Sequence, residues 1–293
     1  MFQHFVITRF NLRQKDWVTS KSNNQVLTDE WMENRLRLFT HYCFPSLLMQ
    51  SEQNFTWLVF FDITTPVKYR SIISQLQQQF PNFMPIFIDG MDEFYQQTKR
   101  EIKQRLTQPF VITSRLDNDD SLHKNYIKEV QSHFNQQAFM AIDFVDGYTL
   151  QIEPYVRFAK RSHTHNPFLS LIESSAHFKT VWFINRHGQW SKIKQLTSVR
   201  HKPMWMSVIH MENKVNEFLG FGRVDWHEID NFNLASSEQA KLASQKKCFE
   251  SWKWRSFRNK FKTDWKVNVK LLKRMLTGCY YSGSKRQLIL VKD

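Results

Sequence analysis

Three aspartates within four residues, Asp117, Asp119 and Asp120, are the side chains best suited to do chemistry in this chain. They follow residues 110–116, a short apolar and β-branched run that is typical of a buried strand. Carboxylates crowded at the end of a strand repel one another, and a hard divalent cation with oxygen ligands relieves that repulsion. Mg²⁺ or Mn²⁺ held by one or two carboxylates keeps coordination positions open for phosphate oxygens. The run therefore predicts a metal-dependent site for a nucleotide-sugar diphosphate.

The same run has a simpler interpretation as an acidic turn. Asp and Asn side chains often hydrogen-bond nearby backbone N–H groups, and Ser121 would suit the N-cap of a following helix. A calcium-binding EF-hand loop does not fit, because its sixth position lacks Gly and its twelfth is Lys128. No GxGxxG or GxxxxGK[ST] motif occurs, which argues against a dinucleotide-binding Rossmann protein and a P-loop NTPase.

Alternating strands and helices are the elements that must position the aspartates. The patterns predict strands at 4–10, 56–61, 84–88 and 110–116, and helices at 28–50 (broken at Pro45), 66–76, 93–106 and 123–134. Four such alternations favour an α/β fold with a mainly parallel sheet flanked by helices. Ligands bind at the carboxyl ends of the strands in such sheets. The acidic run shares that position with Thr8, Arg9 and Asp62.

The pattern changes after residue 135 and becomes rich in β-strands. Strands predicted at 139–145 and 148–152 flank Asp146-Gly147, a strong hairpin signal. Strands predicted at 180–185 and 190–193 flank His187-Gly188, which indicates a second hairpin. We therefore expect a β-rich, acceptor-side region built onto a nucleotide-side region.

The composition is that of a folded protein. With 293 residues the chain is long enough for one large domain or one and a half, and 41% hydrophobic content with 26 Phe excludes wholesale disorder. The first nine residues turn polar too early for a signal peptide, and no apolar run approaches the ~20 residues of a membrane-spanning helix. Cys43, Cys248 and Cys279 fit free thiols in a reducing cytoplasm.

Five sequence blocks, in this order, resemble the bacterial family of putative rhamnosyltransferases, a branch of the GT-A glycosyltransferases. The blocks are Thr8–Asn11, Trp57–Asp62, Ser114–Asp120, Asn166–Glu173 and Pro203–His210. The resemblance covers roughly residues 1–230. It implies a GT-A-like domain over 1–235, Rossmann-like with a mixed, mainly parallel sheet. Residues 1–135 would form its nucleotide-sugar half and residues 136–235 its acceptor half.

The resemblance also implies which residues bind the nucleotide sugar. Asp117 would contact the ribose or the base. Thr8 and Arg9 would line the nucleotide pocket, and Asp62 would lie near the base. Arg115 would neutralise diphosphate charge, although an ion pair with a neighbouring aspartate fits this residue equally.

A metal site is implied as well. Asp119 would bind the Mn²⁺ or Mg²⁺ that bridges the donor diphosphate, and Asp120 would support that site. His210 resembles the C-terminal metal-binding histidine of many GT-A enzymes, and imidazole suits Mn²⁺ better than Mg²⁺. The alternative for His210 is an ordinary surface histidine. The metal and Arg115 would stabilise the charge that develops on the leaving diphosphate.

An inverting glycosyltransferase also needs a carboxylate that takes the proton of the acceptor hydroxyl. Asp143, Asp146, Glu153 and Glu173 are candidates, each with a solvated or capping role as its alternative. Glu173 is preferred because it ends the Asn166–Glu173 block, whereas Asp146 is the expected turn residue.

Residues 236–293 are expected to form a basic helical extension. Residues 241–293 hold 15 Lys and Arg against 3 acidic residues, which supplies 15 − 3 = 12 of the net charge of +14. Trp254, Phe257, Phe261 and Trp265 share one helical face. Such a helix suits an anionic membrane surface, and packing of its aromatic face onto the domain is the alternative. Nucleic acid is disfavoured, because the rest of the chain is nearly neutral.

Two functions are consistent with these patterns. The first is a metal-dependent glycosyltransferase of surface-polysaccharide synthesis that moves a sugar, such as rhamnose, from a dTDP- or UDP-sugar to a glycan or lipid-linked acceptor. It would act in the cytoplasm or peripherally at the inner face of the membrane. The second is a non-catalytic protein that binds membrane or nucleic acid through the basic aromatic tail. A DxD phosphohydrolase is disfavoured, because no Gly-[Thr/Val] follows the aspartates.

Overall fold

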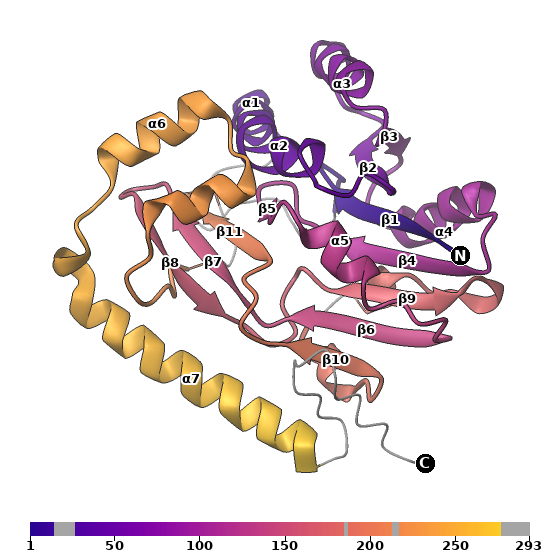
Figure 1. The fold of residues 1–293 in the computed structure, drawn as a ribbon. Helices are drawn as coiled ribbons and strands as arrows, with labels where there is room; N and C mark the ends of the chain where they lie inside the picture. The colour runs from indigo at the N-terminus through magenta and orange to yellow at the C-terminus, as the bar shows by residue number, and fades with distance from the viewer. Residues whose placement is uncertain (15–26, 185–186, 213–216, 277–293) are drawn as a thin grey trace.

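The computed structural model describes residues 1–14, 27–184, 187–212 and 217–276, and it has two β-sheets side by side (Figure 1). The larger, central sheet has seven strands in the order β10-β6-β9-β4-β1-β2-β3. Only β9 runs antiparallel to its neighbours. The strands are β1 (Phe2–Arg9), β2 (Thr56–Asp62), β3 (Phe83–Ile88), β4 (Phe110–Arg115), β6 (Phe139–Phe144), β9 (Ser170–Ser174) and β10 (Leu196–Val199).

Helices cover both faces of the central sheet. One face carries α1 (Asp29–Leu38), α2 (Phe44–Leu48), α3 (Val67–Gln79) and α5 (Tyr126–Gln131), which share one buried apolar cluster with the sheet. The other face carries α4 (Phe94–Arg105) and two 3-10 segments, Val181–Phe183 and His187–Lys192. The predicted α/β fold, with a mainly parallel central sheet flanked by helices, is confirmed.

The predicted helix over 28–50 is not broken at Pro45. A π-helical segment, Phe39–Cys43, joins α1 to α2. Pro45 lies in the first turn of α2, directly after the π-helical segment. Thr28 caps the start of α1 by accepting a hydrogen bond from the N–H of Trp31.

The second sheet has four strands in the order β5-β11-β7-β8. They are β5 (Ser121–Leu122), β7 (Asp146–Gln151), β8 (Arg157–Ser162) and β11 (Trp205–Ile209). A 3-10 segment, Trp226–Phe232, and α6 (Ser236–Gln245) pack on this sheet around Leu150, Val208 and Phe232. Because β5 follows β4 after only five residues, the acidic run joins the two sheets.

The first predicted hairpin is wrong. β6 belongs to the central sheet and β7 to the second sheet, so the two strands do not pair. Asp146 and Gly147 are the first residues of β7 rather than a turn. The carboxylate of Asp146 accepts hydrogen bonds from Ser162 Oγ and from the N–H of His201, and it forms an ion pair with Arg200.

The second predicted hairpin is also wrong. Its expected strands correspond to the 3-10 segments Val181–Phe183 and His187–Lys192, and residues 185–186 lie outside the described residues. Trp182 and Trp190 are buried against the central sheet. Their apolar contacts with the sheet, rather than strand pairing, account for the aromatic pattern of this segment.

The chain described by the structure ends in a long helix, α7 (Lys253–Leu276), which follows a 3-10 turn at Phe249–Trp252. It runs along the second sheet and reaches the β10 end of the central sheet (Figure 1). The basic helix predicted within 236–293 is thus present in the described part of that range. No helix among the described residues is both long enough and apolar enough to cross a membrane.

Burial of His4 predicts that acid destabilises the fold. Its ring is buried in β1 beside Ser114 Oγ, and burial lowers the pKa of His4 to about 3. In the unfolded chain His4 binds a proton near pH 6.5, whereas in the folded chain it stays neutral at that pH. The free energy of unfolding therefore falls as the pH drops below 6.5. Between pH 7 and pH 5 the wild-type protein should lose about 2 kcal/mol more unfolding free energy than His4→Gln does. Urea titrations of both proteins at the two pH values measure this difference. Equal losses would show that His4 becomes protonated within the fold.

Candidate active site

The acidic run forms a turn where the chain passes from the central sheet to the second sheet. Residues 116–120 connect β4 to β5, and β5 pairs with β11 through Leu122 and Trp205. This pairing carries the turn alongside the strand that leads to His210. As a result, Asp119 Oδ2 lies 3.0 Å from His210 Nε2, although the two residues are 91 positions apart.

Asp119 is also paired with a buried arginine. Arg35 Nη1, from α1, lies 2.7 Å from Asp119 Oδ2 and 3.1 Å from Asn118 Oδ1. Burial alone would raise the pKa of Asp119, but the Arg35 charge and the hydrogen bond with His210 lower it below its ordinary value. Asp119 is therefore ionised at neutral pH.

Asp120 has a different partner. Its Oδ1 accepts a hydrogen bond of 2.9 Å from the N–H of Val208, and its side chain is buried. Burial and the charges of Asp119 and Asp117 raise the pKa of Asp120 well above its ordinary value. Asp120 therefore stabilises the junction of the turn with β11, which differs from its predicted role beside the metal.

The predicted metal ligands are thus only partly assembled. Among the described residues there is no group of three or more His, Cys, Asp or Glu side chains arranged to hold a metal ion. Asp119 and His210 are nevertheless 3.0 Å apart, and two adjacent ligands of an octahedral Mg²⁺ or Mn²⁺, each about 2.1 Å from the ion, are separated by about 3 Å. A carboxylate and an imidazole at this separation fit such an ion if the other positions are filled by water and phosphate oxygens.

Two arginines and a tryptophan form a cationic platform at the same edge of the central sheet. The guanidinium carbon of Arg115 lies 3.9 Å from the centroid of the Trp182 ring, and that of Arg9 lies 5.1 Å from it. Arg9 ends β1 and Arg115 ends the neighbouring β4, so the parallel register places them together. Burial lowers the pKa of Arg115 to about 10, which leaves it charged at neutral pH.

Asp117 is the aspartate of the run that solvent reaches most readily. Its side chain is 28% exposed, against 12% for Asp119. Its Oδ1 lies 3.5 Å from Arg115 Nη2, so the ion pair that was one interpretation of Arg115 is present, at a long distance. Asp117 therefore lies between the cationic platform and the Asp119–His210 pair along the turn.

Two predicted nucleotide contacts have other partners. The Thr8 hydroxyl is buried and accepts a hydrogen bond of 2.9 Å from Trp57 Nε1, so it points into the core rather than into a nucleotide pocket. The Asp62 carboxylate accepts hydrogen bonds from Thr64 and Arg13. Burial acts to raise the pKa of Asp62, but those hydrogen bonds outweigh it and lower the pKa overall. Asp62 lies at the expected edge of the sheet, but its oxygens hold the turn after β2.

Glu173, the preferred general base, lies at the opposite end of the sheet. In the antiparallel β9 it pairs with Val111 near the start of β4, whereas the aspartates follow the end of β4. Its two carboxylate oxygens accept hydrogen bonds of 2.8 Å from the N–H groups of Lys179 and Thr180. The structure does not bring Glu173 to the acidic turn.

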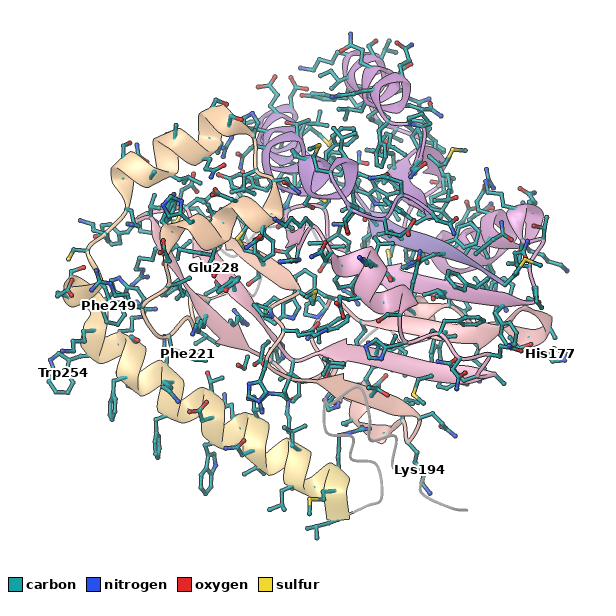
Figure 2. The ribbon with its side chains drawn as sticks, viewed as in Figure 1. His177, Lys194, Phe221, Glu228, Phe249 and Trp254 are labelled. Atoms are coloured by element: carbon teal, nitrogen blue, oxygen red, sulfur yellow. The ribbon has the colours of Figure 1, made fainter. Side chains whose placement is uncertain are left out.

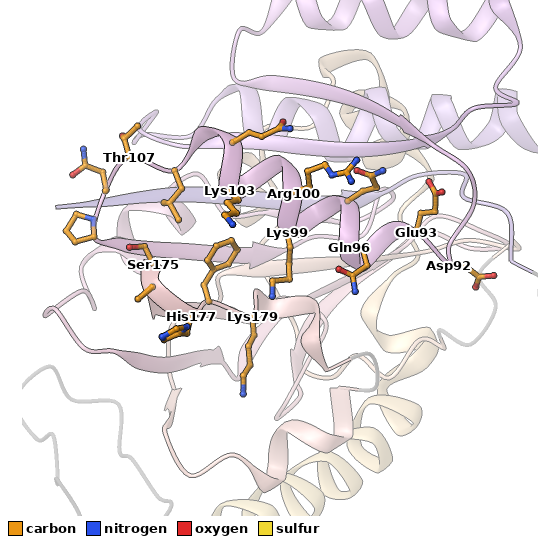
Figure 3. A pocket seen from close by; sticks show the side chains of 17 residues that line it. Asp92, Glu93, Gln96, Lys99, Arg100, Lys103, Thr107, Ser175, His177 and Lys179 are labelled. Atoms are coloured by element: carbon orange, nitrogen blue, oxygen red, sulfur yellow. The ribbon is translucent and has the colours of Figure 1, made fainter.

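The loop that Glu173 holds borders a basic groove between α4 and residues 175–179 (Figure 3). Lys99, Arg100, Lys103 and Lys179 line this groove. It lies at the edge where β4 begins, since Pro109 also lines it. The groove is therefore separate from the acidic turn, at the other end of β4.

The remaining carboxylate candidates are also held by the protein. Asp143 accepts hydrogen bonds from the N–H of His165 and from Asn166 Nδ2, and burial raises the pKa of Asp143 to about 7. Asp146 stabilises the start of β7, as described above. Glu153 accepts a hydrogen bond of 3.1 Å from the N–H of Met211, the residue after His210. Of the four candidates, Glu153 is thus the one that hydrogen-bonds to the residue next to His210, a predicted metal ligand.

The sequence patterns missed Arg35 and Trp182. Arg35 is one of several charged residues on α1, and nothing in its spacing marks it as the partner of Asp119. Trp182 lies in the segment predicted as a hairpin strand, so its position under two arginines could not be expected. Both contacts join segments more than 60 residues apart.

The family described as "Putative rhamnosyl transferase" matches residues 3–220 of this chain. No curated protein matches it. Among solved structures, TarS 1–349 of S. aureus in complex with UDP is 11% identical with a TM-score of 0.40, over 82% of this chain and 69% of that chain. The mannosyltransferase PcManGT of Pyrobaculum calidifontis, in complex with GDP-Man and Mn²⁺, is 11% identical with a TM-score of 0.39, over 94% and 76% of the two chains.

Proposed function

Because the chain belongs to the family described as "Putative rhamnosyl transferase", we propose that it transfers a sugar, rhamnose in particular, from a nucleotide-diphosphate donor to an acceptor hydroxyl. The acceptor is a glycan or a lipid-linked glycan, and the donor is a dTDP- or UDP-sugar. The transfer belongs to the synthesis of a surface polysaccharide. The domain that performs it spans residues 1–235.

One observation carries this proposal: Asp119, in the turn after β4, and His210, directly after β11, meet at 3.0 Å, and the cationic platform of Arg9, Arg115 and Trp182 lies at the same edge of the central sheet. A nucleotide-sugar diphosphate needs both an anchor for a metal and fixed positive charge. In a mainly parallel sheet, the carboxyl ends of the strands are where ligands bind. Asp119, Arg9 and Arg115 all lie at that end.

Each residue has a distinct role in the proposed reaction. Asp119 and His210 would hold Mn²⁺ or Mg²⁺, which when bound neutralises the charge that develops on the leaving diphosphate. Arg115 and Arg9 would stabilise the same charge, because their guanidinium groups are already oriented by Trp182. Asp117, the most accessible of the three aspartates, would accept a hydrogen bond from the ribose or base of the donor.

We place the reaction in a reducing cytoplasm. Cys43 and Cys248, the cysteines within the described residues, are free thiols. Cys43 is buried, and burial and the neighbouring aspartates raise the pKa of its thiol well above the ordinary value. An inert buried thiol beside the acidic turn is consistent with a structural role in that compartment.

Removal of the Trp182 ring should weaken donor binding. Trp182→Leu keeps an apolar side chain against the sheet but removes the face on which Arg9 and Arg115 lie. We expect the KM for the nucleotide sugar to rise about tenfold with a smaller change in kcat. Phe183→Leu, a ring substitution at the next position, is the matched control and should leave the KM unchanged. An equal rise in KM for both variants would contradict the role of the platform.

A donor screen tests the proposed function. The purified chain is incubated with dTDP-rhamnose, UDP-sugars and GDP-sugars, with Mn²⁺, with Mg²⁺ and with chelator, and release of the nucleoside diphosphate is followed. We expect slow, metal-dependent hydrolysis of one donor class. Isothermal titration calorimetry with each donor measures binding independently of turnover. Absence of both binding and hydrolysis for every nucleotide sugar would refute the proposal.

A further inference from the structure

The helix α7 turns its large apolar side chains toward solvent. Trp254 is 84% exposed, and Phe257, Phe261 and Trp265 are each 67–69% exposed. Figure 2 shows Trp254 pointing away from the body of the protein, whereas Phe221 lies on the body side of the helix. Three further exposed apolar residues continue the same row, and they are Leu272, Met275 and Leu276. These seven residues are called the outer stripe below.

The outer stripe extends along most of the helix, with the exposed Asn268 between Trp265 and Leu272. At 3.6 residues per turn, its seven members fall within an arc of about 100°, and a 24-residue helix is about 36 Å long. A row of exposed apolar side chains of this length is unusual, because exposed apolar residues are normally scattered singly. The stripe therefore requires a partner.

The orientation of α7 is set by its opposite face. Asn259 Nδ2 donates to the carbonyl of Gly220, and Ser256 Oγ accepts from the N–H of Gly222. Arg274 donates to the carbonyls of Ile193 and Leu196. These polar side chains are buried, so the helix cannot rotate its aromatic residues inward without breaking their hydrogen bonds. Packing of the aromatic face onto the domain, the alternative raised by the sequence, is not what the structure has.

Cations flank the outer stripe. Arg255, Arg258, Lys262, Lys266 and Lys273 are all exposed and, by helical spacing, lie along one side of it. The helix as a whole has nine Lys and Arg against one acidic residue, Asp264. Two copies of such a helix would repel one another, which disfavours self-association through the stripe. An anionic surface that also accepts apolar side chains complements both features.

We propose that α7 lies flat on an anionic lipid bilayer, with the outer stripe inserted between the headgroups and the flanking cations against lipid phosphates. Aromatic residues on one face and Lys or Arg beside them are the features of helices that bind in the plane of a membrane interface. The buried polar contacts of the inner face keep the body of the protein attached above the helix. This inference does not depend on the proposed glycosyl transfer.

Vesicle co-sedimentation of the full chain tests the inference. We expect binding to vesicles of phosphatidylcholine with phosphatidylglycerol to be at least about tenfold tighter than binding to phosphatidylcholine alone, and to weaken in high salt. The combined variant Trp254→Ser, Phe257→Ser, Phe261→Ser and Trp265→Ser should lose binding about a hundredfold with unchanged circular dichroism, because these side chains make the apolar insertion. Arg258→Glu with Lys262→Glu should abolish the preference for anionic lipid.

A matched control replaces exposed apolar residues elsewhere. Val67 is 79% and Tyr155 is 53% exposed, and Val67→Ser with Tyr155→Ser should bind vesicles as wild type does. Three results would each overturn the inference. They are no vesicle binding by wild type, equal binding by the four-site variant, and a wild-type dimer in sedimentation equilibrium that the four-site variant loses. Tighter binding to a DNA oligonucleotide than to anionic vesicles would likewise assign the helix to another partner.

Discussion

Asp119→Asn is expected to lower kcat/KM for sugar transfer by about a thousandfold, the largest catalytic effect of any substitution at the site. The substitution removes the charge that would hold the metal beside His210 but keeps the shape of the side chain. Asn is preferable to Ala here, because its amide oxygen can still accept the hydrogen bond from Arg35, although either substitution leaves the buried Arg35 without a carboxylate partner. Initial-rate kinetics across a Mn²⁺ titration measure the effect.

Asp120→Asn is the matched control for that experiment. It also removes a carboxylate from the acidic run, but Asp120 accepts a hydrogen bond from Val208, and burial and neighbouring charge favour its neutral form. An amide oxygen can accept the same hydrogen bond, so activity and Mn²⁺ affinity should stay within a few-fold of wild type. Mn²⁺ binding followed by electron paramagnetic resonance separates the two variants without reference to turnover. Equal losses in both would show that the whole run, rather than Asp119, binds the metal.

Gly147→Ala is expected to lower the free energy of unfolding by about 3 kcal/mol or more, the largest effect on stability. A Cβ at this position would lie 2.3 Å from Cδ2 of Trp205 and 2.5 Å from its carbonyl oxygen. Trp205 cannot yield easily, because its ring stacks on Phe168 and its Nε1 donates to the carbonyl of Phe144. Urea denaturation measures the change.

The control for this substitution is Gly188→Ala, where no atom lies within 4 Å of the added methyl group. We expect that variant to unfold within about 0.5 kcal/mol of wild type. Because Trp205 begins the strand that leads to His210, Gly147→Ala should also weaken Mn²⁺ affinity. Equal stability of the two variants would mean that β7 and β11 separate at little cost.

Much of the fold could be predicted from local pattern. In β1 to β4 and in the helices between them, the spacing of apolar residues indicates which faces are buried. The structure has these elements close to their predicted bounds. The two hairpins failed for a common reason. Asp146-Gly147 has the residue types of a tight turn, but Gly147 is required by close contact with Trp205 within a sheet. Turn propensity is a local signal, and such a contact with a distant side chain outweighs it.

The candidate site, like the fold, could be predicted only in part. The position of Asp119, Arg9 and Arg115 at the ends of neighbouring strands follows from strand order, which local periodicity and the parallel arrangement imply. The pairing of β5 with β11 decides which aspartate meets His210 and which one bonds to β11 instead. A two-residue strand is too short to show a periodic pattern, so this pairing could not be predicted. Glu173 was misplaced because β9 runs antiparallel, which puts its last residues at the far end of the sheet.

The sequence by itself determined the alternation of strands and helices, the acidic run after the fourth strand, and a basic helix with an aromatic face, because each depends on residues close together in the chain. Only the tertiary structure decided that Arg35 and Trp182 lie beside the acidic turn, that Asp119 is the aspartate that meets His210, and that the aromatic face of α7 points outward. Those outcomes depend on contacts between distant segments. Burial, charge pairing and available space select such contacts together, and no local spacing encodes them.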